Sequence, residues 1–162
     1  MAQSFHPSKI YAVCYATAMN QNKITLNHIA IAVPDLDAAL KFYRDALGIA
    51  VAGIDEVEQE GVKVAFLPLG DPAAHDGHPP QIELVQPTRD GTGIAKWMSK
   101  NGAGMHHLCV QVSDINAAMQ QARDNGAELI NQTPARRDNG TLYAFIHPKS
   151  TFGVLIELYQ PP

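Results

Sequence analysis

This sequence has few cysteines, no long apolar run and no excess of basic residues. Cys14 and Cys109 are too few for a disulfide framework, which is typical of a reducing compartment. No apolar run reaches the ~20 residues that a membrane-spanning helix needs. Twelve Lys and Arg against sixteen Asp and Glu leave a net charge of −4, whereas nucleic-acid-binding proteins usually present a basic surface. We therefore expect a soluble cytoplasmic protein that binds neither membranes nor nucleic acid.

The composition is that of an ordinary globular domain. The chain has 162 residues, of which 46% are hydrophobic and 17% charged, so it can bury a core of its own. We expect residues 1–23 to form an N-terminal tail that need not be ordered. Residues 24–161 should then form a single domain.

The chain contains an internal repeat. Residues 27–40 match residues 106–119 in character, with His28 aligned to His107, 79 positions later. The segment IELVQP at 82–87 matches IELYQP at 156–161, 74 positions later. Self-similarity in the same order along the chain indicates a duplicated module. The five-residue change in spacing is explained by a longer loop in the first half, at residues 71–80.

Each repeat predicts a strand, a helix and three further strands. Asp35 and Asp114 stand where N-cap residues would start the helices, and Gly48 and Gly126 where the helices would end. The fold class is therefore α+β, with two tandem βαβββ modules whose mixed sheets pair around a central cleft. Repeat one covers 24–88, a linking helix 91–102, and repeat two 103–161. The expected strands are 28–33, 50–54, 62–67, 81–85, 107–112, 128–131, 142–146 and 154–159.

Each repeat also carries one histidine on its first strand and one glutamate on its last. These residues are His28 and Glu83 in the first half, and His107 and Glu157 in the second. One such residue alone is more often a satisfied core polar group or an exposed side chain. A duplicated pair is better explained by a shared divalent metal, because a buried carboxylate needs a partner for its charge. Two imidazoles and two carboxylates suit Co²⁺, Zn²⁺, Ni²⁺ or Mn²⁺.

His106 competes with its neighbour for the metal-ligand role in the second half. The repeat pairs His107 with His28, and side chains alternate between the two faces of a strand. We therefore expect His106 to point away from the cleft.

These features resemble the vicinal-oxygen-chelate (glyoxalase/bleomycin resistance/dioxygenase) superfamily, and specifically its methylmalonyl-CoA epimerase family. The likeness runs from about residue 26 to 160. Val64 stands where some bacterial members carry a glutamate, and the 71–80 loop is longer than is usual. The segments that carry the likeness are LNHIAIAVPDLDAALKFYRDALG (26–48), GVKVAFLPLG (61–70), IELVQP (82–87), GIAKWMSKNGAGMHHLCVQVSDINAA (93–118) and HPKSTFGVLIEL (147–158).

The resemblance implies metal ligands at His28, Glu83, His107 and Glu157, and a homodimer that acts on an acyl-CoA thioester. The implied reaction is metal-dependent epimerisation of methylmalonyl-CoA through α-proton abstraction and a metal-stabilised enolate, with Co²⁺ as the first choice of ion. Glu157 would serve as the base on one face of the enolate. Glu83, or a water held by the ion, would serve on the other.

Six further positions are weighed as contacts to the substrate carboxylate or to coenzyme A. Lys149 and Ser150 lie in the turn before the last strand and could bind the substrate carboxylate or a phosphate. A solvated turn is the alternative. The pairs Lys96/Lys100 and Arg136/Arg137 are interpreted as surface charge in preference to a CoA clamp.

Three other functions remain open on the same scaffold. The first is a glyoxalase I (lactoylglutathione lyase) type of isomerase, which would share the ligand set. The second is a ring-cleaving dioxygenase, which needs two histidines and one carboxylate and would leave Glu83 surplus. The third is a non-enzymatic small-molecule-binding protein, which would need no metal.

Overall fold

The computed structural model describes residues 22–71 and 78–162. Two βαβββ modules follow one another, joined by helix α3, and the expected α+β class is confirmed. The elements are β1 Ile24–Ala32, α2 Leu36–Leu40, η1 Lys41–Ala46, β2 Gly53–Val57, β3 Val62–Pro68, β4 Gln81–Pro87, α3 Gly93–Asn101, β5 Gly104–Val112, α4 Ile115–Asp124, β6 Ala135–Arg136, β7 Leu142–Ile146, η3 Pro148–Ser150 and β8 Leu155–Gln160.

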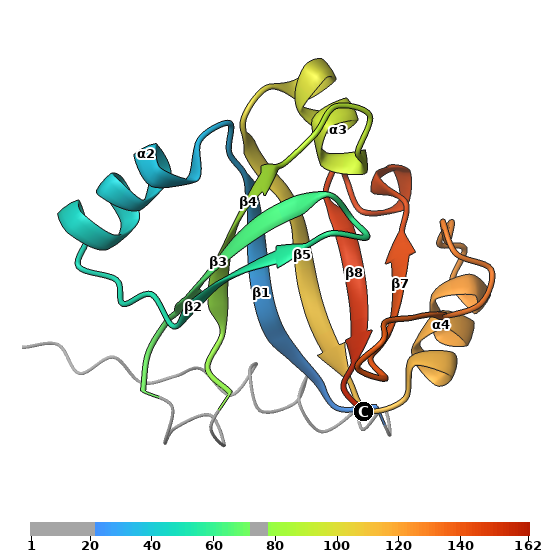
Figure 1. The fold of residues 1–162 in the computed structure, drawn as a ribbon. Coiled ribbons are helices and arrows are strands. Elements are labelled where there is room, and N and C mark those ends of the chain that lie inside the picture. The colour runs from blue at the N-terminus through green and yellow to red at the C-terminus, as the bar shows by residue number, and fades with distance from the viewer. Residues whose placement is uncertain (1–21, 72–77) are drawn as a thin grey trace, which may run out of the picture.

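The strands form one curved, eight-stranded mixed sheet in the order β2-β3-β4-β1-β5-β8-β7-β6 (Figure 1). Within the modules, β1 pairs with β4 and β5 with β8 in parallel. Between them, β1 and β5 pair antiparallel at the centre of the sheet. This pairing satisfies the open edge that each module would otherwise expose. It also places the first strands of both repeats side by side.

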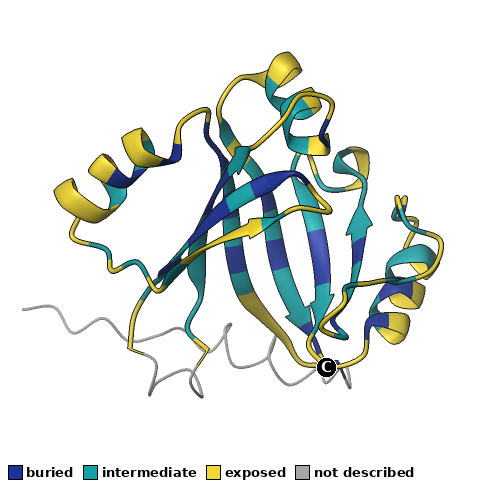
Figure 2. Ribbon diagram, viewed as in Figure 1, coloured by how far each residue is buried: buried dark blue, intermediate teal, exposed yellow. Residues whose placement is uncertain are grey.

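The two repeat helices pack on the sheet through their apolar sides, α2 on the first module and α4 on the second (Figure 2). The side chain of Asp35 accepts a hydrogen bond from the amide of Ala38, and Asp114 does the same for Ala117, as expected for N-caps. Each helix contributes residues to a core cluster in its own module. The fully buried side chains include Leu36 and Leu40 in the first cluster, and Ile115 and Met119 in the second.

Two expected strands are placed differently. The strand expected at 50–54 lies at Gly53–Val57, because the turn that connects it to β3 sets its register. That turn needs Gly61, whose φ is +63° and where an added Cβ would lie 2.7 Å from Thr92 Cγ2. The strand expected at 128–131 is wrong: Leu129 makes only an isolated bridge, and β6 forms further along the chain.

Some expectations fall outside the described residues. These are most of the 1–23 tail, which is described only from residue 22, and residues 72–77 of the 71–80 loop. None of the helices in the described ranges is long and apolar enough to span a bilayer.

Candidate metal centre

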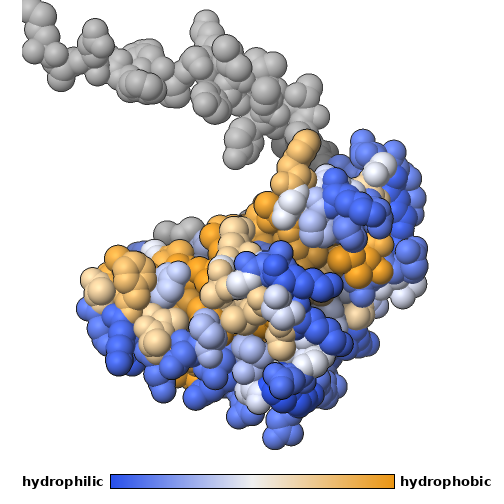
Figure 3. Space-filling model, turned by 90° about the horizontal axis from the view of Figure 1, so that it is seen from above, coloured by the Kyte–Doolittle hydropathy of each residue, from blue (hydrophilic) through white to orange (hydrophobic). Residues whose placement is uncertain are grey.

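A cleft of about 1320 Å³ opens on the concave side of the sheet, and both modules line it. His28, Glu83, His107 and Glu157 all contribute to its walls. They come from β1, β4, β5 and β8, the four central strands of the sheet. From above, apolar residues form a band across the middle of the molecule, between hydrophilic patches (Figure 3).

Three of these four side chains converge on one point. His28 Nε2 lies 3.0 Å from His107 Nε2, and Glu157 Oε2 lies 3.0 Å from His107 Nε2 and 3.7 Å from His28 Nε2. All three residues are buried, with Glu157 only 1% exposed. Their ligand atoms form a cluster with the dimensions of a metal site.

Glu83 lies beside this cluster without joining it. Its Oε1 is 3.3 Å from His28 Nδ1, the ring nitrogen that faces away from His107, and it accepts a hydrogen bond from Gln81 Nε2 at 3.1 Å. Glu83 therefore contacts His28 on the side of the ring that faces away from the cluster. Its assignment as a fourth ligand stays a prediction.

The chemistry of the three converging groups fits a divalent cation. Asn27 Oδ1 accepts a hydrogen bond from His28 Nδ1 at 2.8 Å, which leaves the lone pair of His28 on Nε2. Two nitrogens bound to one ion at right angles, each roughly 2.1 Å away, are roughly 3.0 Å apart. The two Nε2 atoms have this separation, and the carboxylate supplies an oxygen beside them.

The electrostatics favour the protonation states that metal binding requires. Burial lowers the pKa of His28 to about 4, although the nearby Glu157 opposes the shift, so its imidazole is neutral. Burial alone would raise the pKa of Glu157. The hydrogen bond from His107 and the charges of His107 and Arg137 outweigh it and hold this pKa below its usual range. A neutral imidazole and an ionised carboxylate are the ligand forms of these groups.

The pKa of Glu83 is shifted in the opposite direction from that of Glu157. Burial, with a smaller contribution from the charge of Glu157, raises its pKa to about 7. The two glutamates of the repeat therefore differ in charge state near neutral pH. His107 and Arg137 outweigh burial at Glu157, whereas at Glu83 burial and the charge of Glu157 outweigh the same two groups.

Arg137 lies beside the cluster, whereas the sequence favoured surface charge over a CoA clamp for this residue. Its Nη2 lies 3.4 Å from Glu157 Oε1, and its Nε is 3.7 Å from Glu60 Oε1. The guanidinium carbon sits 5.0 Å from the ring centroid of Tyr143. The two oxygens of Glu157 thus have different partners, the histidines on one side and Arg137 on the other. Arg136, its neighbour, is exposed.

The rim of the cleft is tied across the two modules. Gln59 Nε2, in the β2–β3 turn, donates a hydrogen bond of 2.6 Å to Asp138 Oδ2, in the β6–β7 turn. The Arg137–Glu60 contact joins the same two turns. Neither turn carried a sequence pattern that predicted this contact, which depends on how the two modules pair.

The expected direction of His106 is wrong. Its Nδ1 lies 2.8 Å from His107 Nδ1, and the residue lines the cleft. Its ring packs edge-on against Trp97, with the centroids 5.1 Å apart. Regular alternation fails here because the β1–β5 register shifts at this residue.

Lys149 and Ser150 lie in η3, outside the residues that line the cleft. Lys149 is exposed, with its Nζ 3.9 Å from Glu128 Oε2. Ser150 Oγ accepts a hydrogen bond from the amide of Glu128 at 2.8 Å. Their assignment as coenzyme A contacts stays a prediction.

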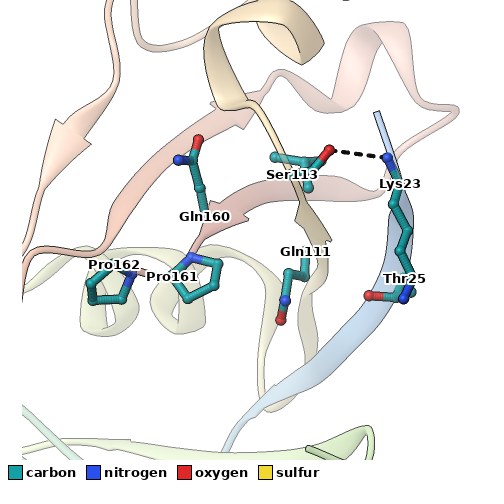
Figure 4. Close-up of a pocket in the computed structure, with 8 residues that line it drawn as sticks. Lys23, Thr25, Gln111, Ser113, Gln160, Pro161 and Pro162 are labelled. Atoms are coloured by element: carbon teal, nitrogen blue, oxygen red, sulfur yellow. Dashed lines mark hydrogen bonds between the residues drawn. The ribbon is translucent and has the colours of Figure 1, made fainter. Parts of the chain in front are cut away.

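A second, smaller cavity of about 350 Å³ lies where β1 begins and β5 and β8 end (Figure 4). The amide of Lys23 donates to Ser113 Oγ at its edge. The described residues that line it include no histidine or acidic side chain, so it lacks the groups that the large cleft assembles. Those residues are Lys23, Thr25, Gln111, Val112, Ser113, Gln160, Pro161 and Pro162.

The fold and the cluster define a protein in which two βαβββ modules share one candidate metal centre. Residues 27–145 match the family model of the Glyoxalase/Bleomycin resistance protein/Dioxygenase superfamily. The chain is 39% identical to the ethylmalonyl-CoA/methylmalonyl-CoA epimerase of Cereibacter sphaeroides, over 83% of this chain and 96% of that protein. It is 37% identical to the mitochondrial methylmalonyl-CoA epimerase of Mus musculus, over 83% of this chain and 72% of the mouse protein.

A solved structure agrees with these relatives. A variant of the Streptomyces coelicolor methylmalonyl-CoA epimerase, in complex with 2-nitronate-propionyl-CoA, matches with a TM-score of 0.73 and 37% identity, covering 84% of this chain and 96% of that one. The chain therefore belongs to the glyoxalase/bleomycin resistance/dioxygenase superfamily and, within it, to the methylmalonyl-CoA epimerase family. It is accordingly an enzyme of the racemase and epimerase class.

Proposed function

We propose that this chain interconverts the two epimers of methylmalonyl-CoA. The observation that carries the proposal is the convergence of His28, His107 and Glu157 in a large cleft of a chain from the epimerase family. The reaction removes the proton on the carbon between the carboxylate and the thioester carbonyl, and returns it on the opposite face. The obstacle is the enolate that forms between these two steps.

His28, His107 and Glu157 would hold a divalent cation, for which we propose Co²⁺ first and Zn²⁺, Ni²⁺ or Mn²⁺ as alternatives. When bound, such an ion would supply positive charge that stabilises the negative charge of the enolate. The three side chains are buried, and electrostatic interactions are stronger at buried positions than in water.

Glu157 and Glu83 are the candidates for the two acid/base groups. Glu157 is ionised and buried, and the contact of its Oε1 with Arg137 is long, at 3.4 Å, so this oxygen could accept a proton. Glu83 lines the same cleft from the other module. Its pKa of about 7 suits a carboxyl group that must both donate and accept a proton near neutral pH.

Val64 supports an acid/base role for Glu83. It lies on β3 opposite Val85 and lines the cleft as an apolar side chain, where some family members carry a glutamate. A carboxyl group at Glu83 would supply the titratable group that this position lacks.

The test is proton NMR of methylmalonyl-CoA in D₂O, after measurement of the metal content of the protein. Enzyme-dependent exchange of the α-proton for deuterium is the expected result. The variant Glu157→Gln should lose exchange, whereas Glu128→Gln, which changes an exposed glutamate outside the cleft, should keep it. Absence of exchange in folded, metal-loaded protein would overturn the proposal.

The same preparation separates the competing functions. Turnover of methylglyoxal with glutathione, in place of exchange, would identify a glyoxalase I type of isomerase. A protein that retains no divalent metal would favour a binding function. The homodimer also stays a prediction, which sedimentation equilibrium can test.

A further inference from the structure

The strand that carries His28 contains an extra residue directly before it. In the antiparallel β1–β5 pair, Leu26 faces Val110 and His28 faces Cys109. β1 thus advances by two residues, from Leu26 to His28, while β5 advances by one, and Asn27 has no residue opposite it in β5. An unpaired extra residue of this kind is a β-bulge, which bends the strand and changes the direction of a side chain.

The partner strand repeats this irregularity at the equivalent position. Ala30 faces His107 and Ile31 faces Met105, so His106 is the extra residue in β5. His106 aligns with Asn27 in the sequence repeat. Each module therefore has a bulge immediately before its converging histidine.

Both bulged side chains contact the histidine that follows them. Asn27 Oδ1 accepts from His28 Nδ1 at 2.8 Å, and its own orientation is fixed because its Nδ2 donates to Gln111 Oε1 at 3.2 Å. His106 Nδ1 lies 2.8 Å from His107 Nδ1. In a regular strand, consecutive side chains point to opposite faces, so neither contact would form without the bulge.

We propose that Asn27 and His106 are paired positioning residues, each accepting a hydrogen bond from the Nδ1 of the following histidine so that its Nε2 faces the shared site. An acceptor on Nδ1 fixes the tautomer and the ring orientation of a metal-binding histidine. An amide oxygen in one module and an imidazole nitrogen in the other perform the same task. This inference rests on the metal site of the proposed function.

The first set of variants removes or keeps the acceptor at each bulge. Asn27→Leu and His106→Phe delete it at similar volume, and His106→Phe keeps a ring against Trp97. Asn27→Asp and His106→Asn keep an acceptor, the latter with the residue type that the first module uses. Asn125→Leu, which changes an exposed residue at the end of α4, is the matched control.

Two readouts separate positioning from a general structural role. Nitrogen-15 NMR of the metal-free protein reports which ring nitrogen of His28 carries the hydrogen. Titration with Co²⁺ alone, followed by absorption, reports affinity. We expect Asn27→Leu to shift the Nδ1–H tautomer of His28, and we expect both Asn27→Leu and His106→Phe to weaken Co²⁺ binding by about 10- to 100-fold. Asn27→Asp and His106→Asn should stay within about threefold of the parent protein.

Three outcomes are informative. An unchanged tautomer in Asn27→Leu, or equal losses in His106→Asn and His106→Phe, would overturn the positioning role. If His28 shows the expected tautomer in the parent protein and Asn27→Leu shifts it, but none of the proteins binds Co²⁺, the positioning role of Asn27 holds. The metal part of the proposed function then fails by itself.

Discussion

Arg137 offers a prediction whose sign depends on whether a cation occupies the cleft. The variant Arg137→Met removes the charge and keeps an apolar stem against Tyr143. In metal-free protein it deletes the 3.4 Å contact to Glu157 Oε1 and so removes the guanidinium charge beside that buried carboxylate. We therefore expect a loss in the free energy of unfolding.

The size of this loss follows from the geometry. Two unit charges 3.4 Å apart interact by roughly 5 kcal/mol at an effective dielectric constant of about 20, before the cost of desolvation. The Arg137 side chain is 37% exposed, so solvent screens much of this, whereas Glu157 is 1% exposed. Exposed pairs contribute about 0.2–1 kcal/mol, and breaking buried ones costs about 3–5 kcal/mol. A loss of about 1–2 kcal/mol lies between these limits.

With a cation bound, the same substitution should cost less. The ion then becomes the main partner of Glu157, and the positive charge of Arg137 repels it. We expect a loss of about 0.5 kcal/mol or less in metal-loaded protein, a difference of about 1 kcal/mol between the two states. By thermodynamic linkage the variant must bind the ion more tightly by the same amount, which is about fivefold.

Urea denaturation in the presence of chelator and at saturating Co²⁺ measures both losses, and direct titration measures the affinity. Arg136→Met is the matched control, because Arg136 is exposed next to Arg137. Arg136→Met should change neither the free energy of unfolding nor the affinity for Co²⁺. Equal losses in the two states, or weaker Co²⁺ binding by Arg137→Met, would refute the reasoning.

Three further predictions address the acid/base groups and the core. Glu157→Gln should lower the rate of α-proton exchange in D₂O by about 10²- to 10⁴-fold, the usual contribution of a positioned base; a rate within a factor of two of the parent would argue against that role. Because the folded pKa of Glu83 is raised from 4.5 to about 7, its stabilising contribution is complete below pH 4.5 and is lost as the pH rises to 7. Urea denaturation of metal-free protein measures this effect as the difference in the free energy of unfolding between the parent and Glu83→Gln. From pH 4.5 to pH 7 the stability of the parent relative to the variant should fall by up to about 3 kcal/mol. A rise over this range would contradict the raised pKa of Glu83. Leu84→Ala, at a fully buried position in the first core cluster, should lower the free energy of unfolding by about 2–5 kcal/mol, again measured in urea.

The repeat made much of the fold predictable. Apolar alternation and N-cap residues identified the first strand and the helix of each module, and Asp35 and Asp114 cap these helices as expected. Edge regions were less predictable. The segment 128–131 was expected to be a strand, but β7 pairs instead with β6 at Ala135–Arg136. Within 128–131, only Leu129 forms a bridge to β7.

The sequence by itself determined which residues come to the centre of the sheet. His28 and His107 occupy the same position in two copies of one module, and antiparallel pairing of the two first strands brings equivalent positions together. The positions of His106 and Arg137 were decided only by the tertiary structure. His106 faces the cleft because of a register shift between β1 and β5, and Arg137 reaches it from a turn that contacts the other module. Both features arise from contacts between residues far apart in the chain, so neither produces a periodic pattern in the sequence.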